Sequence, residues 1–212
     1  TGGAAPRAVV RTGMGPRGAG GRAAALAAAA PRGYGAVLVA GFCAALGPGL
    51  LPGEVIVADR VLGPGGAAAA TTDPAALARS LEALGLPVRT GALHSSDHLV
   101  RGAERRALHR TGALAVDMES AAVLAALPAG LPVAALRVVV DTPERELLRP
   151  GTVPGGLRAW RTLRAAVPAL IGWHRAVPAP SAGPAAPRAI PQLVDPARST
   201  HDFLPTLPQE AS

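Results

Sequence analysis

The chain has 212 residues, enough for one domain with its own core, and carries a formal net charge of +7. Its basic residues are all arginines, scattered along the chain without interleaved aromatic side chains, which argues against a nucleic-acid-binding surface. The single cysteine excludes an internal disulfide and a multi-cysteine metal site, and every apolar run is too short for a membrane span. We therefore expect a soluble, cytoplasmic protein that binds no nucleic acid.

Short apolar segments rich in β-branched residues alternate with alanine-rich segments of helical spacing. This alternation is typical of an α/β domain with a largely buried sheet. The segment TTDPAALARSLEAL predicts the start of a helix, because Asp73 can cap the first turn and Pro74 takes the first helical position. The expected strands are 8–11, 36–40, 54–58, 88–92, 114–116 and 133–140. The expected helices are 18–30, 74–84, 103–110, 118–127 and 157–171.

These elements predict one domain over 1–176, a three-layer α/β/α sandwich around a mixed, twisted sheet. After Trp173 the chain becomes rich in proline and alanine and loses its periodicity. Such a segment cannot bury enough apolar surface to offset the entropy lost on ordering. We therefore expect a disordered tail over 177–212.

Two glycine-containing segments follow predicted strands, and ligands of open α/β sheets bind at the carboxyl ends of strands. In RTGMGPRGAG, Gly13 and Gly15 would let a loop approach a ligand closely, although a tight turn needs the same glycines. In VLVAGFCAALGPGLLPGEVIVAD, small residues around Gly41 and Phe42 are expected to form a loop between strands. Its backbone amides would line a pocket or make an ordinary connection, and the pattern favours neither.

The segment HSSDHLV places His94, Asp97 and His98 close together after a predicted strand. A metal site needs a third well-spaced ligand, which is missing, so we expect no metal. A Ser-His-Asp triad is not expected either, because the chain lacks a Gly-x-Ser-x-Gly nucleophile turn.

Acidic residues stand at the ends of two other predicted strands. VDMES contains Asp117 and Glu119, and LRVVVDTPE carries Asp141 at the end of an otherwise apolar strand. A carboxylate in that position must be solvated or used. Asp141 is equally suited to capping a helix, since DTPE has the composition of a helix start.

Taken in order, RTGMGPRGA, VLVAGFCAALGPGLLPGEVIVAD, HSSDHLV, AVDMESAAV and LRVVVDTPE resemble the nucleoside phosphorylase and nucleosidase superfamily. That superfamily includes purine nucleoside and uridine phosphorylases and methylthioadenosine/S-adenosylhomocysteine nucleosidase. The resemblance covers about 9–144, and the Met-Glu pair followed by the strand-end Asp is its most specific part. It implies an enzyme that cleaves a nucleoside by phosphorolysis or hydrolysis, usually as a homo-oligomer, with no cofactor and with inorganic phosphate as co-substrate in the phosphorolytic case.

The resemblance also implies roles for residues. Glu119 would accept hydrogen bonds from the ribose hydroxyls, and Met118 would pack on the sugar. Asp141 would donate a proton or a hydrogen bond to N7 of a purine, which requires a carboxyl whose pKa is raised by burial. Asp117 fits better as a helix-start residue that interacts favourably with the helix dipole.

The segment SSDHLV resembles the family's base-binding loop, in which Ser96, Asp97 and Leu99 would hold the base. Ser96 stands where the family usually has glycine, and Leu99 where it usually has phenylalanine. Phe42 stands where the family usually has a hydroxyl that helps to hold phosphate, which weakens the phosphorolytic interpretation. The segments that would contact phosphate or the nucleophile contain Gly13, Gly15, Gly41 and Phe42, and the arginines that could supply an anion site are Arg11, Arg17 and Arg101.

The stretch 135–170 is most similar to the hopanoid-associated phosphorylases, which implies adenosylhopane as substrate, with loss of adenine. A large apolar substituent would need an apolar mouth to the site, which Phe42 and Leu99 would suit, although both residues are equally suited to packing in the core. Methylthioadenosine/S-adenosylhomocysteine or futalosine-type nucleosidase activity is one alternative, and a catalytically inactive nucleoside-binding relative is another. The chain begins at Thr1 rather than methionine, too late to show the N-terminal strand of the family. If that strand is absent, an inactive relative is favoured, and if it was trimmed, the site is completed upstream.

Overall fold

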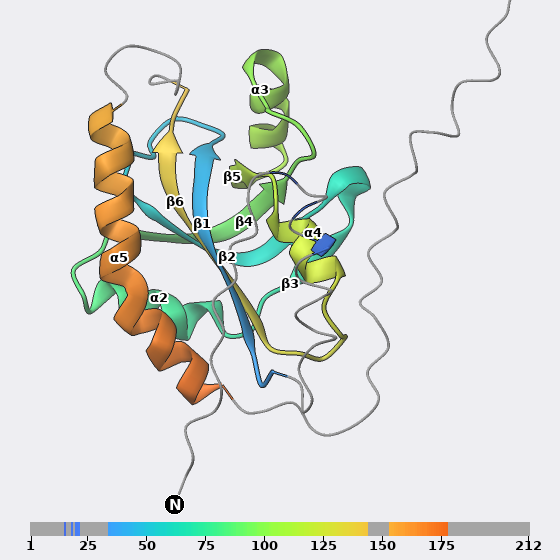
Figure 1. Cartoon of the computed structure of the whole chain (residues 1–212). Helices are drawn as coiled ribbons and strands as arrows, with labels where there is room; N and C mark the ends of the chain where they lie inside the picture. Colours follow the sequence, from blue (N-terminus) through green and yellow to red (C-terminus); the bar gives the residue numbers. More distant parts are fainter. Residues whose placement is uncertain (1–14, 16–17, 19, 22–33, 144–152, 178–212) are drawn as a thin grey trace, which may run out of the picture.

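The computed structural model describes residues 15, 18, 20–21, 34–143 and 153–177 (Figure 1). The strands are β1 (Val37–Ala45), β2 (Val55–Leu62), β3 (Ala68–Ala70), β4 (Val88–Ser95), β5 (Ala113–Asp117) and β6 (Val133–Asp141). The helices are the short 3-10 helix η1 (Pro64–Gly66), α2 (Pro74–Glu82), α3 (Gly102–Arg110), α4 (Ser120–Ala125) and α5 (Val153–Ala176). None of the described helices, α5 included, is both long and apolar enough to cross a membrane.

Each strand and helix predicted within 34–143 and 153–177 is present, with shifted ends. The helix predicted at Pro74 is confirmed, and the Asp73 carboxylate accepts a hydrogen bond from the Ala76 amide at 3.1 Å. The edge strand β3 was not predicted. The predicted strand 8–11, most of the helix 18–30 and the tail beyond Val177 lie outside the described residues.

The prediction of a loop around Gly41 and Phe42 is wrong, because both residues lie inside β1. β1 continues to Ala45 because parallel β6 offers ladder partners along its length, including Gly41 opposite Arg137 and Phe42 opposite Val138. Neighbouring strands thus outweigh the weak strand propensity of glycine and alanine. β4 extends beyond its predicted end for the same reason, and carries Ser95 to a position opposite Asp117 of β5.

The six strands form one mixed sheet in the order β3-β2-β4-β5-β1-β6. The β1–β6, β2–β4 and β4–β5 pairs are parallel, whereas β5 runs antiparallel to β1. An additional antiparallel pairing joins the first half of β2 to β6, so the sheet closes on itself. The predicted mixed sheet in a single α/β domain is confirmed, and the closure adds a feature that strand patterns alone do not reveal.

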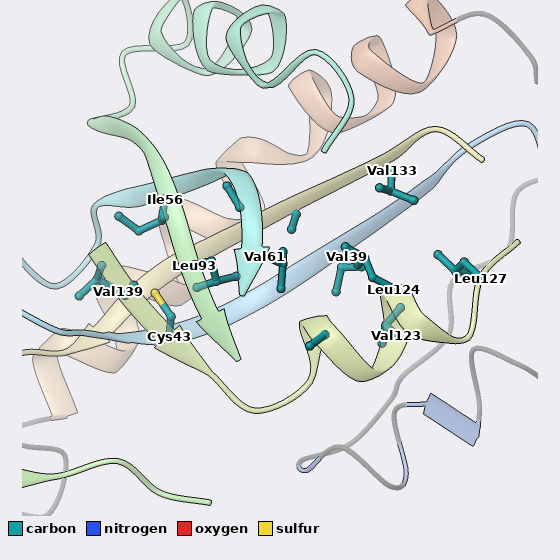
Figure 2. Close-up of a cluster of buried hydrophobic side chains, with 14 of the residues drawn as sticks. Val39, Cys43, Ile56, Val61, Leu93, Val123, Leu124, Leu127, Val133 and Val139 are labelled. Atoms are coloured by element: carbon teal, nitrogen blue, oxygen red, sulfur yellow. The ribbon is translucent and has the colours of Figure 1, made fainter. Parts of the chain in front are cut away.

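Helices cover the sheet on both sides (Figure 1). On one side α2 and α5 pack on alternate residues of β2 and β6, and Leu77, Leu136 and Trp173 belong to that cluster. On the other side α4 packs Val123 and Leu124 onto the remaining alternate residues of the strands (Figure 2). The period of two along β6 therefore sends Val133, Ala135 and Val139 toward α4, and also Arg137.

A bulge disturbs the end of β6. Cys43 of β1 pairs with Val139, but the next residue, Ala44, pairs with Asp141, so one extra residue, Val140, is inserted in β6. Bulges of this kind bend a strand and re-aim its side chains. Here the bulge determines where the Asp141 side chain emerges, beside the end of β1.

Candidate active site

The first part of the candidate site is a buried ion pair beneath α4. The Arg137 guanidinium lies on the core-facing side of β6, and its Nε is 2.6 Å from Oδ2 of Asp117. The two side chains are only 5% and 0% exposed, so each charge needs the other. A Cβ on Gly41 would collide with Nη1 of Arg137, which shows that the guanidinium crosses β1 where a side chain is missing.

Asp117 also organises the start of α4. Its carboxylate accepts hydrogen bonds from both the amide and the hydroxyl of Ser120, and the Arg137 guanidinium donates to the same hydroxyl at 2.8 Å. The predicted helix-start role of Asp117 is therefore seen in the structure. The buried pair with Arg137 was not predicted.

Glu119 lies just beyond this pair, at the first residue before α4, with its side chain 14% exposed. Its Oε1 accepts a hydrogen bond from the Gly15 amide at 3.0 Å, and its Oε2 is 3.9 Å from Nη2 of Arg137. Gly15 adopts a φ of 91°, a conformation that favours glycine. The two predicted site residues Gly15 and Glu119, 104 positions apart in sequence, thus come together, whereas Gly13 lies outside the described residues.

The second part of the site is the end of β6. Oδ2 of Asp141 lies 3.2 Å from Nη1 of Arg105, which comes from α3, and the two side chains are 11% and 4% exposed. Arg105 also donates from Nε to the Ala45 carbonyl at 2.6 Å and from Nη2 to the Asp141 carbonyl at 3.2 Å. The guanidinium of Arg105 therefore holds both the carboxylate and the carbonyl of Asp141 at the end of the strand.

Cys43, a buried residue of β1, lies within the electrostatic influence of Arg137, Asp117 and Arg105. Burial raises the pKa of its thiol far above the ordinary range. The thiol therefore stays protonated at neutral pH and behaves as a small packing group rather than a nucleophile.

The predicted base-binding segment has a buried part and an exposed part. Ser96 is buried, and its amide donates to the Asp117 carbonyl at 2.8 Å, which ties the segment to the end of β5. Asp97 and Leu99 face solvent, and Leu99 is 56% exposed. His98 joins the exposed part to α3, because its two ring nitrogens lie 2.7 Å from Asp97 and 2.8 Å from Glu104.

The pKa values of the two histidines in this segment, His94 and His98, are shifted in opposite directions. Burial lowers the pKa of His94, which lies inside β4, whereas hydrogen bonds to Asp97 and then Glu104 raise the pKa of His98. Across the described residues there is no group of three or more histidine, cysteine or acidic side chains arranged to hold a metal ion.

Sequence reasoning identified the carboxylates but missed the arginines that hold them. Arg137 gave a usable signal, since it is the only charge within the apolar run VAALRVVV. Arg105 gave none, because α3 is a polar helix with several arginines and only the fold selects one of them. Met118 is half-buried beside Glu119, Phe42 is 40% exposed on β1, and Arg101 is exposed.

Chemically, the site offers two partly accessible carboxylates, Glu119 just after β5 and Asp141 at the end of β6, with β1 lying between these two strands. Each is oriented by a fixed donor, the Gly15 amide or the Arg105 guanidinium. Carboxylates held in this way can bind hydroxyls and exchange protons with a bound molecule. The sequence profile of the family described as the phosphorylase superfamily matches residues 2–153 of the chain.

The chain belongs to the phosphorylase superfamily. This confirms the family and the class of enzyme, phosphorylase or nucleosidase, that the motifs predicted. No curated protein matches the chain.

Solved structures share the phosphorylase-superfamily fold. The native futalosine hydrolase of Helicobacter pylori superposes with a TM-score of 0.62 at 17% identity, covering 76% of this chain and 77% of that one. The S-adenosylhomocysteine nucleosidase of Streptococcus pyogenes, solved with 5-methylthiotubericidin, gives 0.60 at 19%, covering 79% and 78%. The 5′-methylthioadenosine/S-adenosylhomocysteine nucleosidase of Helicobacter pylori gives 0.59 at 18%, covering 76% of each chain. At these identities the likeness shows the fold alone.

Proposed function

We propose that this protein cleaves the N-glycosidic bond of an adenine nucleoside. The observation that carries the proposal is the pair of carboxylates, Glu119 and Asp141, each oriented by a fixed donor at the ends of β5 and β6. These two positions are the ones to which the family resemblance assigns ribose binding and base protonation. Membership in the phosphorylase superfamily supports the same reaction class.

In the proposed reaction the bond between C1′ and N9 breaks, and its electron pair passes to the base. Asp141 delivers a proton or a hydrogen bond to N7, which makes the base a better leaving group. Glu119 accepts hydrogen bonds from the ribose hydroxyls, and such bonds strengthen as the sugar becomes oxocarbenium-like. Water or phosphate then forms the new bond to C1′, giving a free sugar or a sugar phosphate.

Within this class we propose a nucleoside with an apolar substituent, and adenosylhopane is the specific candidate. The support is the exposure of two large apolar side chains, Phe42 at 40% and Leu99 at 56%, where the family usually has a hydroxyl residue and an aromatic residue. Methylthioadenosine, S-adenosylhomocysteine and futalosine are the alternative substrates, because nucleosidases and hydrolases named for them share the fold.

The test measures adenine release from adenosylhopane and from methylthioadenosine, each with and without inorganic phosphate. Formation of a sugar phosphate identifies phosphorolysis, whereas a rate of adenine release that does not depend on phosphate identifies hydrolysis. Asp141→Asn is expected to lower the rate by about 10² to 10⁴, the usual contribution of a general acid, while thermal unfolding stays cooperative. Full activity in that variant would remove Asp141 from the proposed role, and inactive wild-type protein would favour a nucleoside-binding relative without catalysis.

A further inference from the structure

The helix α3 buries an arginine where a helix normally buries an apolar residue. Of the nine residues of this helix, Gly102–Arg110, only Arg105 is buried, with 4% exposure, while the neighbouring Arg106 faces solvent. Taking a guanidinium out of water is costly unless its donors are satisfied and its charge is balanced. Arg105 meets both conditions at a single place, the joint end of β1 and β6.

All three donor nitrogens of Arg105 are engaged there. Nε and Nη2 donate to the backbone carbonyls of Ala45 and Asp141, and Nη1 donates to the Asp141 carboxylate. The two backbone bonds fix the plane of the guanidinium with respect to the strands, and the third fixes the carboxylate with respect to that plane. A lysine could supply the charge at this place but not the three-pronged geometry.

We propose that Arg105 is a positioning residue that acts through Asp141, holding its carboxyl toward the departing base and stabilising the carboxylate that remains after the proton has moved. This inference rests on the proposed function, since it takes Asp141 as the group that meets N7. Arg105 itself touches neither the sugar nor the base in this scheme. Its three hydrogen bonds are all made to acceptors of the protein itself, on Ala45 and Asp141.

The bulge in β6 explains why such a device is needed. The extra residue Val140 shifts the ladder by one residue, so Asp141 pairs with Ala44 and the regular alternation along β6 no longer fixes the direction of its side chain. Arg105 restores that constraint from a different element. Because the developing negative charge on Asp141 is buried beside a fixed positive charge, the arginine favours the transition state more than the ground state.

The experiment compares Arg105→Met and Arg105→Lys with wild-type protein, using the adenine nucleoside that wild-type protein cleaves, methylthioadenosine or adenosylhopane. Arg106→Met, an exposed neighbour on the same helix, is the matched control. We expect Arg105→Met to lower kcat by about ten- to a hundredfold, with KM within about threefold, because the lost interaction is made mainly in the transition state. Arg105→Lys should recover part of kcat, and Arg106→Met should match wild type.

Two results overturn the proposal: unchanged kcat in Arg105→Met, or a loss that appears in KM as strongly as in kcat, which indicates general disruption of the site. If Arg105→Met fails to fold, Arg105→Lys carries the same comparison of kcat with KM, and full kcat in that variant counts against the proposed geometry. Adenine release that Asp141→Asn abolishes but Arg105 variants spare refutes the role of Arg105 alone. Absence of adenine release by wild-type protein refutes the proposed function itself.

Discussion

Two arginine–carboxylate pairs each take one residue from β6, Arg137 in the first and Asp141 in the second, and they are built differently. Arg137 and Asp117 both belong to strands, and their nearest atoms are 2.6 Å apart with almost no exposure. Arg105 and Asp141 join a helix to a strand end at 3.2 Å, and the carboxylate keeps 11% exposure. The first pair is fully buried and supports α4, whereas the second joins α3 to the bulged end of β6.

The largest effect on stability should come from breaking the buried pair of Arg137 and Asp117, here called the inner pair. Arg137→Met would leave the Asp117 carboxylate buried without its counter-charge, which costs about 3–5 kcal/mol of folding stability. Chemical denaturation measures this loss directly. Arg60→Met is the control, because Arg60 and Asp59 form an exposed pair worth less than about 1 kcal/mol.

A second variant sharpens the same comparison. Replacing both partners, Asp117→Leu with Arg137→Met, removes the uncompensated charge and should recover most of the lost stability. If the double variant is as unstable as Arg137→Met alone, the instability comes from packing and not from the unpaired carboxylate.

Binding is the next largest effect, and it concerns Glu119. Glu119→Gln keeps the shape and an acceptor for the Gly15 amide but removes the charge that would strengthen bonds to ribose hydroxyls. Such charge-assisted bonds are worth about 1.5–3 kcal/mol, so nucleoside affinity should fall by roughly 10- to 100-fold. Calorimetry with 5-methylthiotubericidin, the ligand in the Streptococcus pyogenes structure, measures it. Glu82→Gln, at the exposed end of α2, is the control, and equal affinities in the two variants would count against a ribose role.

Filling the space that Gly41 leaves for the Arg137 guanidinium should cause a smaller loss of stability. Gly41→Ala places a methyl group against Nη1 of Arg137, and overpacking of this kind costs about 1–3 kcal/mol. Gly172→Ala, at an open position within α5, should instead be as stable as wild type or up to about 1 kcal/mol more stable. Thermal unfolding of both variants tests this, and equal melting temperatures would mean that the guanidinium moves aside without cost.

The contrast between local and tertiary interactions also explains what the sequence could predict. The start of α2 was predicted because Asp73 and Pro74 act within one turn. The roles of Glu119 and Asp141 were predicted from the order of several short motifs, because that order resembles a known family. Arg105, the partner of Asp141, could not be found in the same way, because contacts between distant elements select it from several arginines of α3. Arg137 is visible as a charge in an apolar run, but nothing in the sequence indicates its partner Asp117. The loop predicted at Gly41 failed for a related reason, since parallel pairing with β6 extends β1 through it.

The smallest effect belongs to the exposed cluster of His98, Asp97 and Glu104, whose side chains are 57%, 52% and 45% exposed. Hydrogen bonds to Asp97 and then Glu104 raise the pKa of His98 above 6.5, and the bond to His98 lowers the pKa of Asp97. The histidine contribution to stability is therefore complete below pH 6.5 and is lost as pH rises through the raised value. The aspartate contribution is lost at the opposite end, as pH falls through the lowered value.

His98→Asn should consequently lose less than about 1 kcal/mol near pH 6, and this deficit should shrink toward pH 9 as the histidine of the wild-type protein loses its proton. Thermal unfolding between these pH values, at low and high salt, measures the difference, and salt should reduce it because all three groups face solvent. A deficit that is equal at both pH values would show that His98 acts by packing. In that case the exposed cluster would differ from the inner pair of Arg137 and Asp117, because it would depend on packing whereas the inner pair depends on charge compensation.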